Sequence, residues 1–153
     1  MNLSEVVKKE CCFRLNENKK TEVLIEMMEC IHQKGFIEDL ENLKKEIFYR
    51  EQLMSTGVGM GIGIPHVRFK GVEKPLIAIG IKEKGVVDYD SIDNEDIKII
   101  VMIMVGENQH KEHIRLLSQV IGRMKDAGDR EKLIHASDSE EIYNLLTGSA
   151  SDD

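Results

Sequence analysis

Residues 50–66 have the sequence REQLMSTGVGMGIGIPH, in which four glycines alternate with other residues before a proline and a histidine. Alternate glycines remove the side chains from one side of an extended segment, so that another backbone or a ligand can approach closely. Pro65 fixes its own φ and favours an extended conformation at Ile64. The pattern predicts a helix that ends, a tight turn, and a short apolar strand that holds His66 rigidly at its end, at the surface.

The composition of the chain is typical of one soluble globular domain. Of its 153 residues, 41% are hydrophobic and 32% are charged, which is sufficient for a buried core. No apolar run approaches the roughly 20 residues of a membrane span, and the N-terminus lacks the apolar segment of a signal peptide. We therefore expect a cytosolic protein that does not insert into a membrane. The net charge of −7 argues against a nucleic-acid partner, whose phosphates would be repelled.

The three cysteines, Cys11, Cys12 and Cys30, do not have the number or spacing of a disulfide framework. They also lack the C-x-x-C spacing of a zinc or redox site. We expect reduced thiols and no bound metal.

Hydrophobic periodicity and capping residues place helices before and after a group of strands. Helices are expected over residues 3–12, 21–33, 37–54, 109–126 and 130–135, and from the capping box Ser137-x-x-Glu140 to Gly148. Residues 11–13 have an alternative, the start of a strand. In the helix over 109–126, the side chains expected to face inward are Ile114, Leu117, Val120, Ile121 and Met124.

Strands are expected over residues 76–82 and 97–105, with a turn at 84–85. The segment over 97–105, IKIIVMIMV, is almost continuously apolar and β-branched, which indicates a strand buried on both faces. Together these elements predict a single α/β domain over residues 1–148, with a small mixed β-sheet sandwiched between helices. Residues 149–153 are polar and are expected to form a disordered tail.

His66 is the first candidate for chemistry. An imidazole that accepts a phosphoryl group needs one unprotonated nitrogen aimed outward, while an acceptor holds the other ring N–H and so fixes the tautomer. The rigid segment before His66 supplies a fixed aim. The alternative is a histidine without a chemical role, but the GIGIP sequence before it favours a phosphoryl acceptor.

His113 and Arg50 are the second and third candidates. His113 lies in the first turns of the helix over 109–126, where backbone N–H groups and the helix dipole favour an anion. Beside a phosphorylated histidine it would bond the phosphate or stabilise the acceptor tautomer; the alternative is a space-filling surface histidine. Arg50 offers planar, multi-donor recognition of phosphate oxygens. Its alternative is a solvated charge paired with Glu46 or Glu51.

Other classes of site fit this sequence poorly. The run GVGMGIG is not followed by the Lys-Ser/Thr pair of a P-loop, and it precedes a strand and Pro-His where a dinucleotide site needs a helix. No serine or cysteine lies in a nucleophile elbow. His110 and His113 have the spacing of half a metal site, but a third ligand is missing.

Three parts of the chain, the pair Arg50–Glu51, the triplet Ser55–Thr56–Gly57 and the segment GIGIPH over 61–66, resemble the signature of a known family. They are similar to enzyme IIA domains of the fructose–mannitol class in the bacterial phosphoenolpyruvate-dependent sugar phosphotransferase system. The resemblance covers about residues 3–147 and is most specific in the R-E…S-T-G…G-I-P-H run.

The resemblance implies a mixed sheet between helices and one acceptor histidine, His66, in a shallow depression. It implies that His66 takes a phosphoryl group from the phosphocarrier HPr and passes it to a IIB protein, without a metal or nucleotide cofactor. The family's second histidine falls on His113 and its active-site arginine on Arg50. A hydrophobic ring around His66, with acidic residues outside it, would meet a basic carrier surface.

Two positions depart from the family pattern. Val67 follows the histidine where a small residue is expected, and we expect it to narrow access to the ring. Gly63 replaces a common alanine, which should be harmless. We expect any IIB partner to be a separate chain. The sequence leaves open whether the protein serves transport, is a regulatory paralogue of the nitrogen-related type, or is a domain of this fold without phosphorylation; it does not specify a sugar or an oligomeric state.

Overall fold

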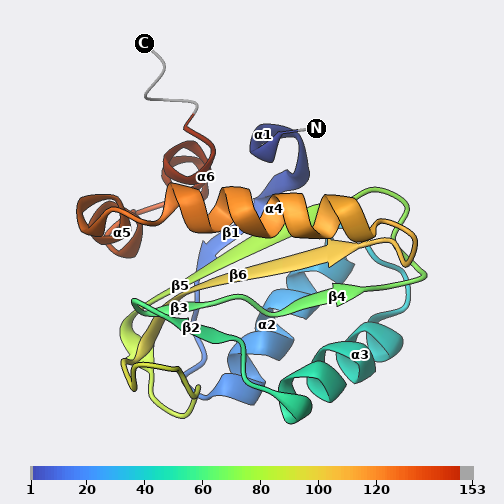
Figure 1. The fold of residues 1–153 in the computed structure, drawn as a ribbon, viewed down its shortest axis with the longest axis horizontal. Helices are drawn as coiled ribbons and strands as arrows, with labels where there is room; N and C mark the ends of the chain where they lie inside the picture. Colours follow the sequence, from blue (N-terminus) through green and yellow to red (C-terminus); the bar gives the residue numbers. More distant parts are fainter. Residues whose placement is uncertain (1, 149–153) are drawn as a thin grey trace.

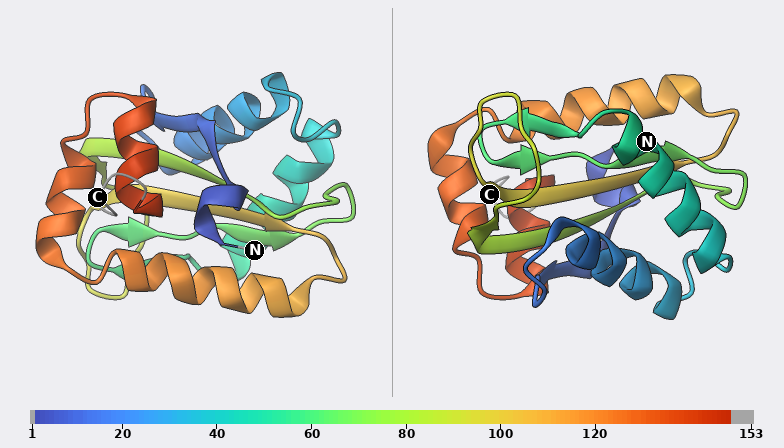
Figure 2. Two further views of the ribbon diagram at one scale, coloured as in Figure 1. Left: turned by 90° about the horizontal axis from the view of Figure 1, so that it is seen from above. Right: turned by 90° about the horizontal axis from the view of Figure 1, so that it is seen from below.

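Residues 2–148 are described by a computed structural model, in which a six-stranded mixed sheet lies between two layers of helices (Figures 1 and 2). The strands are β1 (Val7–Arg14), β2 (Gly57–Gly59), β3 (Ile62–Gly63), β4 (His66–Arg68), β5 (Leu76–Val86) and β6 (Ile97–Val105). The helices are α1 (Leu3–Val6), α2 (Lys20–Gln33), α3 (Leu40–Leu53), α4 (His110–Arg123), α5 (Ala127–Ile134) and α6 (Ser139–Thr147). This architecture confirms the predicted α/β sandwich. The tail expected over 149–153 lies outside the described residues.

Strand β6 is the centre of the sheet, whose order is β1-β5-β6-β3-β2, with β4 also paired to β6. It runs antiparallel to β5 and parallel to β3 and β4. Its side chains alternate between two apolar clusters, as the twofold period of a strand requires. Ile99, Val101 and Ile103 belong to one cluster, and Ile100 and Met102 belong to the other. The prediction of a strand buried on both faces is therefore confirmed.

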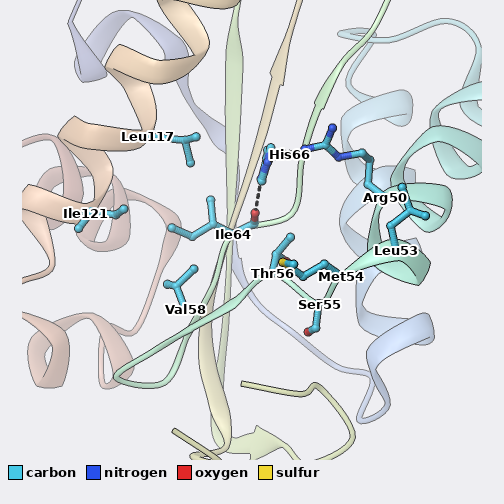
Figure 3. A pocket seen from close by; sticks show the side chains of 10 residues that line it. All are labelled: Arg50, Leu53, Met54, Ser55, Thr56, Val58, Ile64, His66, Leu117 and Ile121. Carbon is cyan, nitrogen blue, oxygen red and sulfur yellow. Dashed lines mark hydrogen bonds between the residues drawn. The ribbon is translucent and has the colours of Figure 1, made fainter. Parts of the chain in front are cut away.

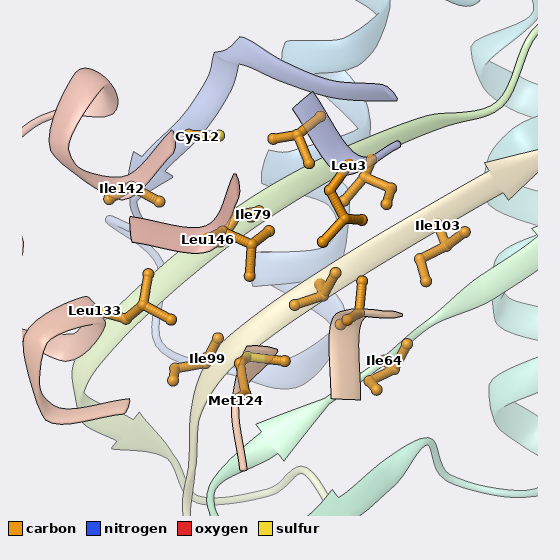
Figure 4. Packing of buried hydrophobic residues seen from close by; sticks show 14 of the residues in the cluster. Leu3, Cys12, Ile64, Ile79, Ile99, Ile103, Met124, Leu133, Ile142 and Leu146 are labelled. Carbon is orange, nitrogen blue, oxygen red and sulfur yellow. The ribbon is translucent and has the colours of Figure 1, made fainter. Parts of the chain in front are cut away.

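The two clusters are covered by different helices. Helices α1, α4, α5 and α6 cover one face of the sheet, and α2 and α3 cover the other (Figure 2). Figure 4 shows the first cluster, where side chains from α4, α5 and α6 pack onto β5 and β6. None of the helices within residues 2–148 is both long and apolar enough to cross a membrane.

The expectation of a helix over residues 3–12 is wrong beyond Val6, where the helix ends. From Val7 the chain is extended and pairs in parallel with β5, with Val7 opposite Ile77 and Cys12 opposite Ile79. Strand formation at residues 11–13, the alternative drawn from the sequence, is the correct one. Local helix propensity is a weak preference, and pairing with the long strand β5 overrides it here.

Three smaller expectations also need correction. Helix α3 begins at Leu40 instead of residue 37, because the carboxylate of Asp39 accepts a bond from the backbone N–H of Asn42. Helix α6 is capped one residue later than expected, by Asp138, which accepts the N–H of Glu141. Residues 84–85 do not end the strand, since β5 continues to Val86 through an irregularity in its pairing with β6.

The inward face expected for α4 is partly wrong. Val120 and Met124 are buried as expected, and so is Leu116, which was not expected. Ile114 and Ile121 are 56% and 37% exposed. These two apolar side chains are therefore partly exposed on a helix that borders the candidate site.

Candidate functional site

The glycine-rich segment forms a hairpin that brings His66 to the edge of β6. Strands β2 and β3 pair antiparallel, and the turn between them has left-handed backbone at Met60 (φ 60°) and Gly61 (φ 76°). The backbone of Asp90 approaches Gly57 so closely that a Cβ there would collide with its carbonyl oxygen. Only glycine therefore fits at this position. The predicted reason for the glycines is correct at Gly57. His66, however, is the first residue of β4 and not the end of the preceding strand.

Two hydrogen bonds fix the tautomer of His66. Its Nδ1 lies 2.7 Å from the carbonyl oxygen of Ile64, which can only accept (Figure 3). Its Nε2 lies 3.1 Å from Nη2 of Arg50, which can only donate. The proton therefore resides on Nδ1, and the lone pair of Nε2 faces the guanidinium. Sequence reasoning expected an acceptor for the ring N–H but had no means of assigning it to the backbone of Ile64.

The half-buried position of His66 favours the neutral imidazole. Burial lowers its pKa below the usual 6.5, and the positive charge of Arg50 lowers the pKa further. The hydrogen bond to Ile64 and the charge of Glu51 act in the opposite direction. The net effect is a ring that keeps an unprotonated nitrogen at neutral pH.

Arg50 lies in the last turn of α3 and reaches across the sheet edge to His66 (Figure 3). The alternative drawn from the sequence was an ion pair with Glu46 or Glu51. Glu51 is instead engaged by Lys20, at 2.9 Å between Nζ and Oε1. Because this partner occupies the Glu51 carboxylate, the guanidinium of Arg50 is available for the histidine.

His113 lies on α4, on the opposite side of the His66 ring from α3. The two imidazole rings meet edge to face, with 4.8 Å between centroids. His113 is only 7% exposed, and its buried Nε2 has no hydrogen-bond partner within the described part of the chain. The structure thus brings all three candidates, Arg50, His66 and His113, into one cluster.

The pKa of His113 is lowered to about 4, first by burial and then by the neighbouring charges of His66 and Arg50. In the unfolded chain the pKa of His113 is near 6.5, so between pH 6.5 and pH 4 the unfolded chain binds a proton at His113 and the folded chain does not. We expect the free energy of unfolding to fall as the pH is lowered from about 6.5 to about 4, with a contribution of up to about 3 kcal/mol from His113.

Urea unfolding of wild type and of His113→Phe at near-neutral pH and near pH 4.5 measures this contribution. The variant should lose less stability over the interval than the wild type. His135→Phe is the matched control, because His135 is 58% exposed. Equal losses in wild type and His113→Phe would contradict the assignment to His113.

An apolar pocket of about 480 Å³ is lined in part by His66 (Figure 3). Its wall is formed by Arg50, Leu53, Met54, Ser55, Thr56, Val58, Ile64, His66, Leu117 and Ile121. Several of these side chains are unusually exposed for their size, with Leu53 at 66% and Met54 at 78%. Val67 does not narrow this pocket as expected, because it points to the opposite face of the sheet and is 2% exposed.

A cluster of buried and half-buried polar side chains next to the pocket was not anticipated from the sequence. The carboxylate of Glu51 accepts from Lys20 and from the hydroxyl of Thr56, at 2.7 Å. Thr56 also bonds the hydroxyl of Tyr89 at 2.5 Å, and the ammonium of Lys20 lies over the Tyr89 ring. These residues come from α2, α3 and two loops, and no spacing in the sequence connects them. The cluster anchors the end of α3, from which Arg50 extends.

Tyr89 also gives Gly63 a role that the sequence did not indicate. A Cβ at Gly63 would lie 2.8 Å from Cζ of Tyr89, so the ring occupies the space that an alanine methyl group needs. We therefore expect Gly63→Ala to destabilise this chain by about 1–3 kcal/mol, contrary to the expectation that alanine is harmless.

A double-mutant cycle with Tyr89→Ala tests this steric conflict by urea unfolding. In the Tyr89→Ala background the cost of Gly63→Ala should largely disappear. A cost that is the same in both backgrounds would show that the Tyr89 ring is not its source.

Residues 5–149 match the family model described as "Phosphoenolpyruvate-dependent sugar phosphotransferase system, EIIA 2". The chain belongs to this family. The EIIA domain is 29% identical over 147 residues to the "PTS system fructose-specific EIIABC component" of Bacillus subtilis, a match that covers 95% of this chain. It spans only 23% of that larger relative.

Two solved structures show the same fold. Nitrogen regulatory protein IIA-Ntr from Neisseria meningitidis superposes with a TM-score of 0.85 at 26% identity, over 95% of this chain and 99% of that one. The IIA protein in a complex of enzyme IIAMTL with phosphorylated enzyme IIBMTL from Escherichia coli superposes with a TM-score of 0.77 at 21% identity, over 94% and 99%. The chain is therefore similar both to a fructose-specific component of the phosphotransferase system and to a nitrogen regulatory protein.

Proposed function

We propose that this EIIA domain accepts a phosphoryl group from the phosphocarrier HPr on Nε2 of His66 and donates it to a IIB protein. The observation that supports the proposal most directly is the pair of hydrogen bonds at the ring, Nδ1 to Ile64 and Nε2 to Arg50. They leave the lone pair of Nε2 as the nucleophile and place a cation beside it.

The transfer itself exchanges one bond to phosphorus for another. The bond between phosphorus and the donor atom of HPr breaks as the bond between phosphorus and Nε2 of His66 forms. No proton has to leave His66, because the reacting nitrogen is already unprotonated and the other proton stays on Nδ1, which donates it to the carbonyl oxygen of Ile64. The partners position the phosphoryl group and exclude water, which is the main requirement for phosphoryl transfer.

Arg50 and His113 would hold the transferred group. When phosphorus takes the lone pair of Nε2, the guanidinium of Arg50 loses its acceptor and can turn to the phosphate oxygens. The buried Nε2 of His113 has no hydrogen-bond partner among residues 2–148, and a phosphate oxygen would supply one. Arg50 and His113 would thus make stronger interactions when His66 is phosphorylated than when it is not.

The apolar pocket wall is the surface that we assign to HPr and IIB. Leu53, Met54, Val58 and Ile121 are exposed and line the same pocket as His66, and Ile114 is exposed on the same helix as Ile121. Such a surface would exclude water once a partner covers it. The net charge of −7 suits a basic carrier. The cytosolic location and the separate IIB chain remain predictions.

The second candidate function is regulation by phosphorylation-dependent protein binding. The similarity to IIA-Ntr, with a TM-score of 0.85, favours it. In that case His66 is phosphorylated but phosphate leaves it only by hydrolysis.

The experiment starts from the purified protein incubated with phosphoenolpyruvate, enzyme I and HPr. Intact mass spectrometry should show the addition of one phosphate that is labile in acid. A chase with IIB proteins then separates the two functions, because only the transport component loses its phosphate to IIB. Failure to gain phosphate from active donors would overturn both.

A further inference from the structure

Two of the three thiols lie against each other at a distance from the candidate site. Cys11 on β1 and Cys30 on α2 have their Sγ atoms 3.7 Å apart, and Cys30 also lies 3.5 Å from the carbonyl oxygen of Glu10. All three cysteines are free in this structure. The pair joins the sheet to the helix that covers it.

Cys12 is adjacent to Cys11 in the sequence but faces the other side of the sheet. It belongs to the apolar cluster beneath α6, whereas Cys11 belongs to the cluster beneath α2. Its Sγ lies 3.4 Å from the carbonyl oxygen of Lys8. The alternation of side chains along β1 therefore selects Cys11, and not its neighbour, as the partner of Cys30.

The two paired thiols also differ in access. Cys11 has no exposed surface, while Cys30 is half-buried. We propose that Cys11 and Cys30 form an oxidation site that reacts with low-molecular-weight disulfides to give an intramolecular disulfide between β1 and α2. This proposal does not depend on phosphoryl transfer.

The reaction has two exchange steps. The Cys30 thiolate attacks one sulfur of the small disulfide R–S–S–R, forming a mixed disulfide and releasing RS⁻, which takes up the proton lost by Cys30. The Cys11 thiolate then attacks the Cys30 sulfur and displaces the second RS⁻, which takes up the proton lost by Cys11. The protein loses two hydrogen atoms, and the small disulfide is reduced to two thiols.

The second step should be the slower one. Burial raises the pKa of the Cys11 thiol far above its usual value, and the neighbouring Cys30 raises the pKa further. The thiolate of Cys11 is therefore scarce. The sulfur atoms must also approach from 3.7 Å to the bond length of about 2.05 Å. We expect the mixed disulfide at Cys30 to accumulate before the internal bond forms.

The test treats the native wild-type protein with an excess of oxidised glutathione and follows intact mass over time. A glutathione adduct should appear first and then convert to a species that lacks two hydrogen atoms. Peptide mapping without reduction should locate the bond between Cys11 and Cys30. A wild-type protein that stays unmodified, or that forms a bond involving Cys12, would overturn the proposal.

Three variants of the folded protein, checked by circular dichroism, sharpen the result. Cys12→Ala should oxidise as the wild type does. Cys11→Ala should stop at the adduct on Cys30, and Cys30→Ala should form neither adduct nor disulfide, because Cys11 is inaccessible. Faster modification of Cys11 than of Cys30 would contradict the proposed order. In the unfolded wild type no two cysteines are held together, so oxidation should give a mixture of disulfide pairings.

Discussion

The His66→Gln variant is expected to acquire no phosphate from phosphoenolpyruvate, enzyme I and HPr, a complete loss of the acceptor function. Glutamine has about the length of histidine, but its amide nitrogen has no free lone pair and cannot act as the nucleophile. His113 cannot replace it, because that ring is 7% exposed and lies behind the ring of His66. The measurement is the intact mass of the protein after incubation with the donors.

The matched control for this prediction is His135→Gln, which makes the same change on a side chain that is 58% exposed and contacts Glu83 and Glu131. The control should gain one phosphate at the wild-type rate. The free energy of unfolding of both variants should lie within about 1 kcal/mol of the wild-type value, since neither substitution opens a large cavity. Phosphate on His66→Gln at any histidine would refute the assignment of His66 as the acceptor.

The parts of the fold with strong patterns could be predicted from the sequence. Strand β6 could be predicted clearly because IKIIVMIMV is apolar at every position but one. Such a continuous apolar run is typical of a strand that is buried on both faces. The N-terminus failed for the opposite reason. A helix was expected over residues 3–12, with the start of a strand at 11–13 as the alternative, and the choice is made by pairing with Ile77 and Ile79, which lie more than sixty residues away in sequence.

The sequence was sufficient to predict the candidate residues Arg50, His66 and His113, but not the groups that contact and position them. His66 was selected as a candidate because Pro65 restricts the backbone before it and the alternating glycines indicate a close approach to this segment. The acceptor for its Nδ1–H is a backbone carbonyl, which every residue has, so no residue type marks it. Lys20 and Tyr89 contact Glu51 and Thr56 only after α2 and the loop containing Tyr89 pack together. Contacts of this kind depend on the tertiary structure and have no local signal.

The Arg50→Met variant is expected to accept phosphate roughly 10²- to 10³-fold more slowly than the wild type, which is the usual cost of removing one donor to developing negative charge. Methionine keeps much of the apolar stem of the side chain but has no donor and no charge. Arg50→Lys should recover part of the rate, because an ammonium supplies charge without the planar fork of donors. Rapid quenching followed by mass spectrometry measures the three rates.

An NMR titration of His66 tests the same contact without any partner protein. The positive charge of Arg50 lowers the pKa of His66, so Arg50→Met should raise this pKa toward its usual value. Lys45→Met removes a positive charge from an exposed position on the same helix and should change neither the rate nor the pKa. A slow Arg50→Met variant with an unchanged His66 pKa would mean that the guanidinium acts on the partner and not on the ring. A raised pKa with a normal rate would mean that the contact at 3.1 Å exists but does not assist the transfer.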